Sequence, residues 1–315
     1  MARVIVAGKY QLLKKIGEGS FGKIFWGETP HDPPFVRSIP LEGVKCATEC
    51  GTLGGDGGSW GVSPQGGDGG ACKAAPRAIK IMSSSHIEVF KNEVAMYEKL
   101  REIKGIPTLY ESGIEGKFNY IVMDLLEQSL EEVHKNYGDQ MSLKVVLHLA
   151  QQMLTIVEQI HAYGIVHRDL KPANFLLKTN AQQVSELYLI DFGLAKCFLD
   201  EKGRHCAIKT NEQIVGTTRY MSVNTHHGLT ASRRDDLESL GYIMLFLYHG
   251  ELSWQKQTAV VELKQRLDFH NNVGANNNVG EFILFILYCR NLGFADKPNY
   301  DYLRGLLLNL NKINT

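Results

Sequence analysis

A short polar segment in the middle of the chain carries side chains that could perform chemistry together. It reads His-Arg-Asp-Leu-Lys-Pro-Ala-Asn and places Asp169, Lys171 and Asn174 close to one another, and Asp191 follows at the start of an Asp-Phe-Gly triplet. A carboxylate can accept the proton of a hydroxyl group, carboxylate and amide oxygens suit Mg²⁺, and a lysine can neutralise charge on a phosphoryl group. Together these residue types indicate transfer of a phosphoryl group to a hydroxyl.

A glycine-rich segment near the N-terminus has a spacing that suits a phosphate-binding loop. Gly17, Gly19 and Gly22 stand in Gly-Glu-Gly-Ser-Phe-Gly, with Ser20 between them. The same spacing occurs in dinucleotide-binding enzymes, but there a helix opens at the third glycine. Here Lys-Ile-Phe-Trp follows at residues 23–26 and predicts a strand. We therefore favour a hairpin that lies over the phosphates of a nucleotide. The alternative function, a nucleotide-dependent oxidoreductase, is strongly disfavoured.

Lys80 lies in an apolar Ala-Ile-Lys-Ile run that predicts a strand. A lysine in such a strand is costly to bury unless an opposite charge pairs with it. Glu93 lies on the next predicted helix, and its carboxylate is the expected partner. This pair would hold Lys80 against the α- and β-phosphates of a nucleotide. The alternative, a surface lysine and a surface glutamate, is favoured only if the other motifs are set aside.

Apolar periodicity predicts the elements that must position these residues. Apolar side chains recur at helical spacing over residues 83–100 and 143–163, which predicts two amphipathic helices. Residues 237–248 are apolar nearly all round, which predicts a helix buried on most sides. Tyr-Leu-Ile at residues 188–190 predicts the strand that delivers Asp191.

The order of these elements predicts an α+β fold with two lobes. The first third is rich in predicted strands and carries one helix, and the remainder is mainly helical. We expect residues 1–123 to form the smaller, mainly β lobe, and residues 124–315 to form a hinge and a larger helical lobe.

A low-complexity insertion over residues 29–76 separates two predicted strands of the smaller lobe. It contains Gly-Gly-Asp-Gly-Gly twice, and such a composition cannot supply a packed core. We expect it to be disordered and dispensable for activity, because loop closure entropy grows only slowly with length. Its cysteines Cys46, Cys50 and Cys72, with His31 upstream, lack the paired spacing of a zinc site, so free thiols are favoured over a metal site.

The motifs together resemble the signature set of protein kinases, in order and spacing: the glycine-rich loop, the Ala-Ile-Lys strand, the His-Arg-Asp loop and Asp-Phe-Gly. Several further segments are similar to the casein kinase 1 family in particular, which carries Ser-x-Asn where most kinases carry Ala-Pro-Glu. These segments are residues 105–107, 123–130, 216–226, 232–242 and 294–303. The resemblance covers Tyr10 to Leu308 apart from the insertion.

This resemblance implies an ATP- and Mg²⁺-dependent kinase that phosphorylates serine and threonine of protein substrates. It assigns Asp169, Lys171 and Asn174 to catalysis and Asn174 and Asp191 to Mg²⁺. The residues that it places around the nucleotide are Ile16, Gly17, Gly19, Ser20, Gly22, Ile24, Ala78, Lys80, Glu93, Met123 as the gatekeeper, Asp124 and Leu126 of the hinge, and Asp191. Asp236 resembles the aspartate that braces the catalytic loop from below.

The resemblance also bears on regulation and substrate choice. Family members are active without phosphorylation of the activation loop, and we expect the same here, although Thr210, Thr217 and Thr218 are available as sites.

Relatives prefer a phosphorylated or acidic residue upstream of the target, held in an anion pocket. Arg219 and Gly250 match two of its groups. The positions of two of its lysines are taken by Glu212 and Glu262, so we expect the preference to be weakened or lost.

The composition and the apolar runs of the chain bear on its binding partners and its location. The 34 basic and 34 acidic residues cancel, which gives no indication of a nucleic-acid or membrane partner. The longest apolar runs fall far short of the ~20 residues that span a bilayer, and no secretory signal is recognised. We therefore expect a cytoplasmic monomer, with a nuclear location left open.

Two alternatives within the same fold stay open. A catalytically weak scaffold is disfavoured by the complete set of catalytic residues. A small-molecule kinase is disfavoured because such enzymes generally lack the peptide-positioning segment that residues 216–226 resemble.

Overall fold

The computed structural model describes residues 4–19, 21–29, 76–138, 140–180, 185–266 and 280–313. Ser20 of the predicted phosphate loop lies outside these ranges. So do residues 30–75, which hold nearly all of the predicted insertion together with His31, Cys46, Cys50 and Cys72. The described cysteines Cys197, Cys206 and Cys289 are free thiols.

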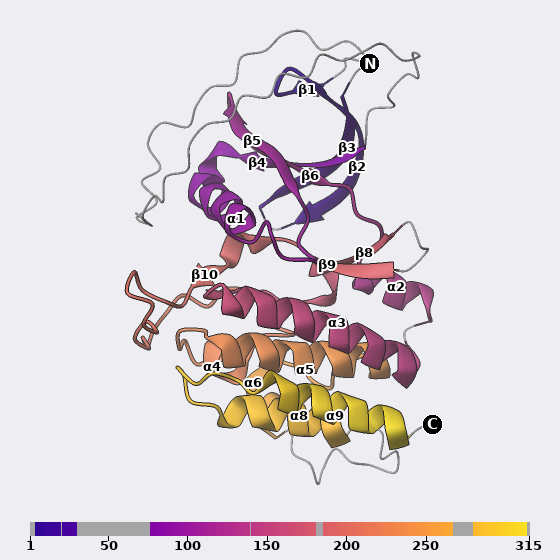
Figure 1. Cartoon of the computed structure of the whole chain (residues 1–315), viewed down its shortest axis with the longest axis vertical. Helices are drawn as coiled ribbons and strands as arrows, with labels where there is room; N and C mark the ends of the chain where they lie inside the picture. The colour runs from indigo at the N-terminus through magenta and orange to yellow at the C-terminus, as the bar shows by residue number, and fades with distance from the viewer. Residues whose placement is uncertain are drawn as a thin grey trace, which may run out of the picture.

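The smaller lobe is built on an antiparallel sheet whose strands lie in the order β1-β2-β3-β4-β6-β5 (Figure 1). The strands are β1 (Ile5–Val6), β2 (Tyr10–Gly19), β3 (Gly22–Glu28), β4 (Arg77–Ser83), β5 (Leu109–Glu115) and β6 (Phe118–Asp124). β3 and β4 pair with Ile24 opposite Lys80 and with Gly27 opposite Arg77. The chain therefore leaves β3 and enters β4 at neighbouring points, at the end of the hairpin away from the glycine-rich turn.

One helix covers this sheet. The predicted helix over residues 83–100 is present as the 3-10 turn η1 (Ser84–His86) followed by α1 (Ile87–Lys99). Ser83 accepts a hydrogen bond from the Ser85 N–H and so caps the 3-10 turn rather than the α-helix. α1 buries Phe90, Val94 and Tyr97 against the core, and it also buries Glu93. An acid on a buried helical face needs a partner.

The larger lobe is mainly helical. Its helices are α2 (Leu130–Asn136), α3 (Leu143–Ala162), α4 (Val223–His226), α5 (Arg233–His249), α6 (Val260–Gln265), α8 (Gly280–Asn291) and α9 (Tyr300–Ile313). Short strands and turns lie between them: β7 (Ile165–Val166), η2 (Pro172–Asn174), β8 (Phe175–Thr179), β9 (Ser185–Leu189), η3 (Phe192–Leu194) and β10 (Lys196–Cys197). The α+β class predicted from the sequence is therefore seen in the structure.

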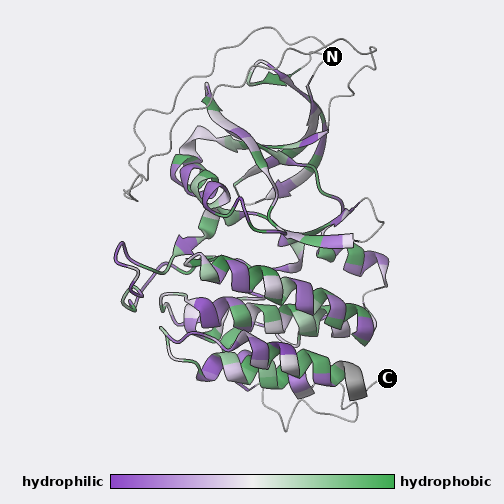
Figure 2. Ribbon diagram, in the orientation of Figure 1, coloured by the Kyte–Doolittle hydropathy of each residue, from purple (hydrophilic) through white to green (hydrophobic). Residues whose placement is uncertain are grey.

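α5 is the centre of the larger lobe. It packs against α3 on one side and α8 on the other, and α9 packs on both α3 and α8. Residues 235–247 of α5 are all buried, as the apolar pattern over residues 237–248 predicted. Figure 2 shows hydrophobic residues, in green, alternating with hydrophilic ones, in purple, along the stacked helices of this lobe. None of the helices in the described ranges is both long and apolar enough to cross a membrane.

Candidate active site

A buried ammonium group joins three elements at the boundary between the lobes. Lys80 of β4 donates to both carboxylate oxygens of Glu93 of α1, at 2.8 and 2.7 Å, and to Oδ1 of Asp191 at 2.9 Å. Burial alone would lower the pKa of Lys80, but the charges of Glu93 and Asp191 outweigh it and hold the pKa above its usual value. The pairing predicted from the sequence is therefore present, and a permanent cation lies beside Asp191.

The start of the Asp-Phe-Gly turn is held in a strained conformation. Asp191 has φ +67°, in the left-handed region that non-glycine residues rarely adopt. Its N–H donates to the Tyr97 hydroxyl at 3.2 Å, and Phe192 is buried with its ring edge-on to Tyr97 and to His167. These contacts stabilise the strained turn, which places the Asp191 carboxylate next to Lys80.

Asn92 of α1 is a second anchor for this turn. Its amide nitrogen lies 3.0 Å from the carbonyl oxygen of Gly193 and 2.9 Å from that of Ala195. Sequence reasoning missed this residue. Its place directly before Glu93 on a helix that faces the site was the only available signal.

The Asp169 carboxylate is fixed on both oxygens. Oδ2 accepts a hydrogen bond from Lys171 Nζ at 2.7 Å, and Oδ1 accepts from the N–H and the hydroxyl of Thr217 at 2.8 and 2.7 Å. The Asn174 amide donates to the Asp169 carbonyl at 2.9 Å. The structure therefore brings Asp169, Lys171 and Asn174 together. It adds Thr217, which the sequence indicated only as a phosphorylation site.

Asp236 of α5 supports this loop from below. Its carboxylate accepts the backbone N–H of His167 at 2.7 Å and that of Arg168 at 2.9 Å. These bonds hold Arg168 at φ +70°, a second strained position. Burial would raise the pKa of Asp236, but the hydrogen bonds and the electrostatic interactions that it makes with His161 and His167 keep it below its usual value. The bracing position predicted for Asp236 is thus occupied as expected.

The support continues outward through two residues that the sequence did not indicate. His161 of α3 lies with Nε2 3.0 Å from Asp236 Oδ2 and Nδ1 2.8 Å from the hydroxyl of Tyr300 on α9. The catalytic loop is therefore tied through one buried polar chain to α3, α5 and α9.

The glycine-rich hairpin forms as predicted, since β3 and not a helix follows Gly22. A Cβ at Gly19 would meet no atom within 4 Å, whereas a Cβ at Gly22 would lie 2.4 Å from the Ile81 carbonyl oxygen. Gly22 is thus required by the close approach of β4. Gly19 stands in open space, which leaves its backbone approachable by a ligand.

Four of the residues predicted around the nucleotide lie on four consecutive strands of the sheet, β2, β3, β4 and β6. Ala78 of β4 and Met123 of β6 are register partners and are buried, while Ile24 of β3 is partly buried on the main core and Ile16 of β2 is exposed. Asp124 ends β6, and Leu126 follows it. The Asp124 carboxylate accepts hydrogen bonds from the Thr108 N–H and the Tyr110 hydroxyl. Because the side chain is bound within the protein, any contact of Asp124 with the adenine base must come from its backbone.

The oxygen donors at this site fit Mg²⁺. The Asn174 amide nitrogen donates to the Asp169 carbonyl, which leaves the amide oxygen as an acceptor. Asp191 supplies a carboxylate, and the residue before it, Ile190, donates its N–H to the Asn174 carbonyl at 3.0 Å. Mg²⁺ is usually held by one or two protein oxygens with phosphate and water completing the shell. Within the described ranges no group of three or more His, Cys, Asp or Glu side chains could hold a metal alone. The donors present are therefore of the kind that binds Mg²⁺ together with a nucleotide.

The predicted anion pocket is only partly assembled. The Arg219 guanidinium lies 5.8 Å from the ring centres of Tyr220 and Phe246. The Gly250 N–H donates to the Phe246 carbonyl at 2.8 Å as the C-cap of α5, so this amide already has a partner. Of the two glutamates at predicted lysine positions, Glu262 is exposed, and Glu212 lies 4.0 Å from Lys196 Nζ.

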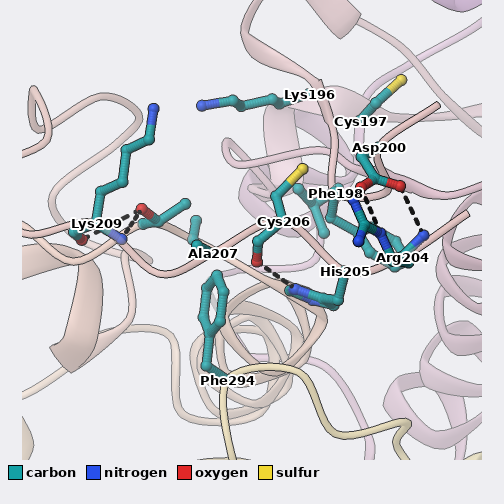
Figure 3. A pocket seen from close by; sticks show the side chains of 13 residues that line it. Lys196, Cys197, Phe198, Asp200, Arg204, His205, Cys206, Ala207, Lys209 and Phe294 are labelled. Carbon is teal, nitrogen blue, oxygen red and sulfur yellow. Dashed lines mark hydrogen bonds and ion pairs between the residues drawn. The ribbon is translucent and has the colours of Figure 1, made fainter. Parts of the chain in front are cut away.

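A cavity of about 520 Å³ opens beside the activation segment, which we define as residues 191–226 (Figure 3). Phe198 and Phe294 form apolar parts of its wall, and Arg204 at its edge is paired with Asp200 at 2.8 Å. The lining includes none of the residues predicted for catalysis or for nucleotide binding. The cavity is therefore separate from the predicted nucleotide site.

Substitution of Asp236 tests whether the support beneath the catalytic loop is required. Asp236→Ala leaves two backbone N–H groups and His161 without their acceptor, so we expect stability to fall by about 3–5 kcal/mol and kcat to fall about 10²-fold in the fraction that folds. Urea unfolding and kinase assays measure the two effects. Asp301→Ala is the control, because Asp301 is exposed on α9. Equal behaviour of the two variants would contradict the bracing role.

The comparison with known families agrees with this geometry. A protein kinase domain model matches residues 67–284, a range that contains Lys80, Glu93, Asp169, Asn174 and Asp191. The glycine-rich hairpin precedes the matched range, so its role rests on the geometry given above. Since the match covers more than half of the chain, this chain belongs to the protein kinase family.

Proposed function

We propose that this kinase transfers the γ-phosphoryl group of Mg-ATP to serine and threonine hydroxyls of proteins, with a specificity like that of the casein kinase 1 family. The observation that carries the proposal is the assembled site: Lys80 paired with Glu93 and Asp191, and Asp169 fixed between Lys171 and Thr217. A catalytically weak scaffold has no need of this complete set.

Each residue of the site has a distinct task in this reaction. Mg-ATP supplies the phosphoryl group, and its metal neutralises charge on the phosphates. Lys80 binds and orients the α- and β-phosphates. Asp169 orients the acceptor hydroxyl and takes its proton, while Lys171 stabilises negative charge on the group being transferred. Because Glu93 fixes Lys80 and Thr217 fixes Asp169, positioning is provided before the substrate arrives.

The contact between Asp169 and Thr217 supports serine and threonine as acceptors. Thr217 belongs to the activation segment, and its N–H and hydroxyl both bind Asp169 Oδ1. A hydroxyl carried on Cβ can reach Asp169 only if the peptide backbone runs close to this segment. A tyrosine would hold the backbone several ångströms farther away, where the segment around Thr217 gives it less support.

The Ser-x-Asn motif supports the casein kinase 1-like assignment. Ser222 accepts from the Thr225 N–H at 3.1 Å as the N-cap of α4, and its hydroxyl donates to Asp235 of α5 at 2.6 Å. Nearby, Glu238 of α5 binds Arg290 of α8 at 3.0 Å. In this chain a serine thus attaches the end of the activation segment to α5, at the place where most kinases carry Ala-Pro-Glu.

Glu212 supports activity without loop phosphorylation. Burial lowers the pKa of the Arg168 guanidinium, and the negative charges of Asp236 and Glu212 act against this. Glu212 also lies 4.0 Å from Lys196. It thus supplies a fixed negative charge close to two cations, Arg168 of the catalytic loop and Lys196 of the activation segment. In other kinases a phosphorylated loop residue supplies such a charge. This grouping differs from the sequence-based expectation that Glu212 repels a phosphorylated substrate at Arg219.

Matched peptides test the acceptor class. The wild-type protein with Mg-ATP should phosphorylate casein and an acidic peptide that carries serine or threonine, and should lose at least about 10³-fold in kcat when Asp191→Ala removes the metal-binding carboxylate. The same peptide with tyrosine as acceptor should be a poor substrate. Efficient phosphorylation of the tyrosine peptide, or activity retained in Asp191→Ala, would contradict the proposal.

Phosphatase treatment tests activation. We expect treated wild-type enzyme to keep its kcat/KM, and Glu212→Gln to lose about fivefold because a half-exposed ion pair contributes about 1 kcal/mol. Thr210→Ala serves as a control, since Thr210 is exposed. If the treated enzyme were inactive and recovered only after rephosphorylation of Thr210, Thr217 or Thr218, the assignment of Glu212 would be wrong.

A further inference from the structure

Lys264 of α6 is one of the largest fully buried side chains of the described chain. Its ammonium donates to the carbonyl oxygens of Thr218 at 2.8 Å and Met221 at 2.7 Å, and lies 3.1 Å from His226 Nε2. A lysine ammonium has three N–H donors. All three therefore have an acceptor, and all three acceptors belong to the end of the activation segment.

The charged groups that face Lys264 come from three helices. His226 lies on α4, Glu238 and Tyr242 on α5, and Arg290 on α8, and Glu238 is already paired with Arg290 at 3.0 Å. The Lys264 ammonium lies 4.9 Å from the ring centre of Tyr242, and Arg290 donates to the Lys264 carbonyl at 2.8 Å. Burial lowers the pKa of Lys264 to about 7, with Glu238 acting to raise it and Arg290 to lower it.

Burial of a lysine without a dedicated carboxylate is unfavourable for packing alone. The core of the larger lobe already closes through contacts among α3, α5, α8 and α9. What Lys264 adds is a connection from α6 to the backbone of the activation segment. Each of its three donors has an acceptor, which indicates that Lys264 makes this connection and does not merely fill space.

The connected backbone is the part that follows the catalytic contact. Thr217 binds Asp169, and the next carbonyl, that of Thr218, is held by Lys264. The Arg219 carbonyl accepts from Trp254 Nε1 at 2.9 Å, and the Met221 carbonyl is again held by Lys264. The shape of residues 217–221 is therefore set by α6 and the loop before it.

We propose that Lys264 is a positioning residue that holds residues 217–221 of the activation segment in the shape that receives a protein substrate. The inference rests on the proposed function, in which this segment meets the peptide next to Asp169. Lys264 does not offset the charge of Glu262 at the predicted anion pocket, although it is close to Glu262 in sequence, because it is fully buried and its donors are taken.

This role has a consequence for pH dependence. Below neutral pH Lys264 is charged and makes three donor contacts, whereas the neutral amine has only two N–H groups and must release one acceptor. His226 stays an acceptor throughout this range, because burial and the Lys264 charge lower its pKa to about 4. Protein substrate binding should therefore weaken as the pH rises through neutrality, while ATP binding should not.

Steady-state kinetics from pH 6 to 8.5 test the proposal in the full-length protein. Lys264→Met keeps the length of the side chain and removes its charge, and Lys256→Met is the control because Lys256 is exposed. In wild type and Lys256→Met, the KM for a serine peptide should rise with pH. In Lys264→Met it should be at least about tenfold higher at the low end and show no such rise, since hydrogen bonds to a charged group are lost. The KM for ATP should stay unchanged in all three.

The results of this experiment distinguish failure of the positioning role of Lys264 from failure of the proposed function. Wild-type peptide KM and pH profile in Lys264→Met, or an equal rise in the KM for ATP, would overturn the positioning role. If Lys264→Met does not fold, the wild-type profile decides, and a peptide KM independent of pH overturns the proposal. A wild-type enzyme that hydrolyses ATP but phosphorylates no peptide would instead contradict the proposed function.

Discussion

The active site of this kinase depends on neutralising one buried positive charge. The Lys80 ammonium lies in the interior at the boundary of the two lobes, where an unpaired cation would cost several kcal/mol. Glu93 and Asp191 provide the compensation, and they come from α1 and from the turn after β9. The sheet, helix α1 and the Asp-Phe-Gly turn are therefore placed together, because burial of each of these three charged side chains depends on the other two.

The strained backbone at the site is held by buried helices of both lobes, α5 of the larger lobe and α1 of the smaller one. Arg168 and Asp191 both adopt left-handed backbone conformations, and each donates its backbone N–H to a buried side chain. Asp236 binds the backbone before Asp169, and Tyr97 binds the backbone of Asp191. The buried helices thus stabilise a site geometry that the loops alone would not keep.

The sequence predicted those features that depend on the local pattern of residues. It did not predict those that depend on contacts between residues far apart in the chain. The Lys80–Glu93 pair follows from the cost of burying a lysine in an apolar strand, and the buried helix over residues 237–248 follows from its composition. Lys264 shares the core-facing side of a short helix with Val260 and Leu263, but a lysine is rarely fully buried. Its partners are 38, 43 and 46 residues away, so the local pattern did not reveal them. Likewise, the contacts of Thr217 with Asp169 and of Glu212 with Lys196 join residues that only the fold brings together.

The most direct test of the account is the charge on Glu93. Glu93→Gln keeps the size and the hydrogen-bonding capacity of the side chain but leaves the Lys80 ammonium less well neutralised. We expect kcat/KM for ATP to fall about 10²-fold, while Glu98→Gln, on the exposed side of the same helix, leaves it unchanged. A Glu93→Gln enzyme that folds with wild-type stability and keeps wild-type kcat/KM would contradict the claim that this pair organises the site.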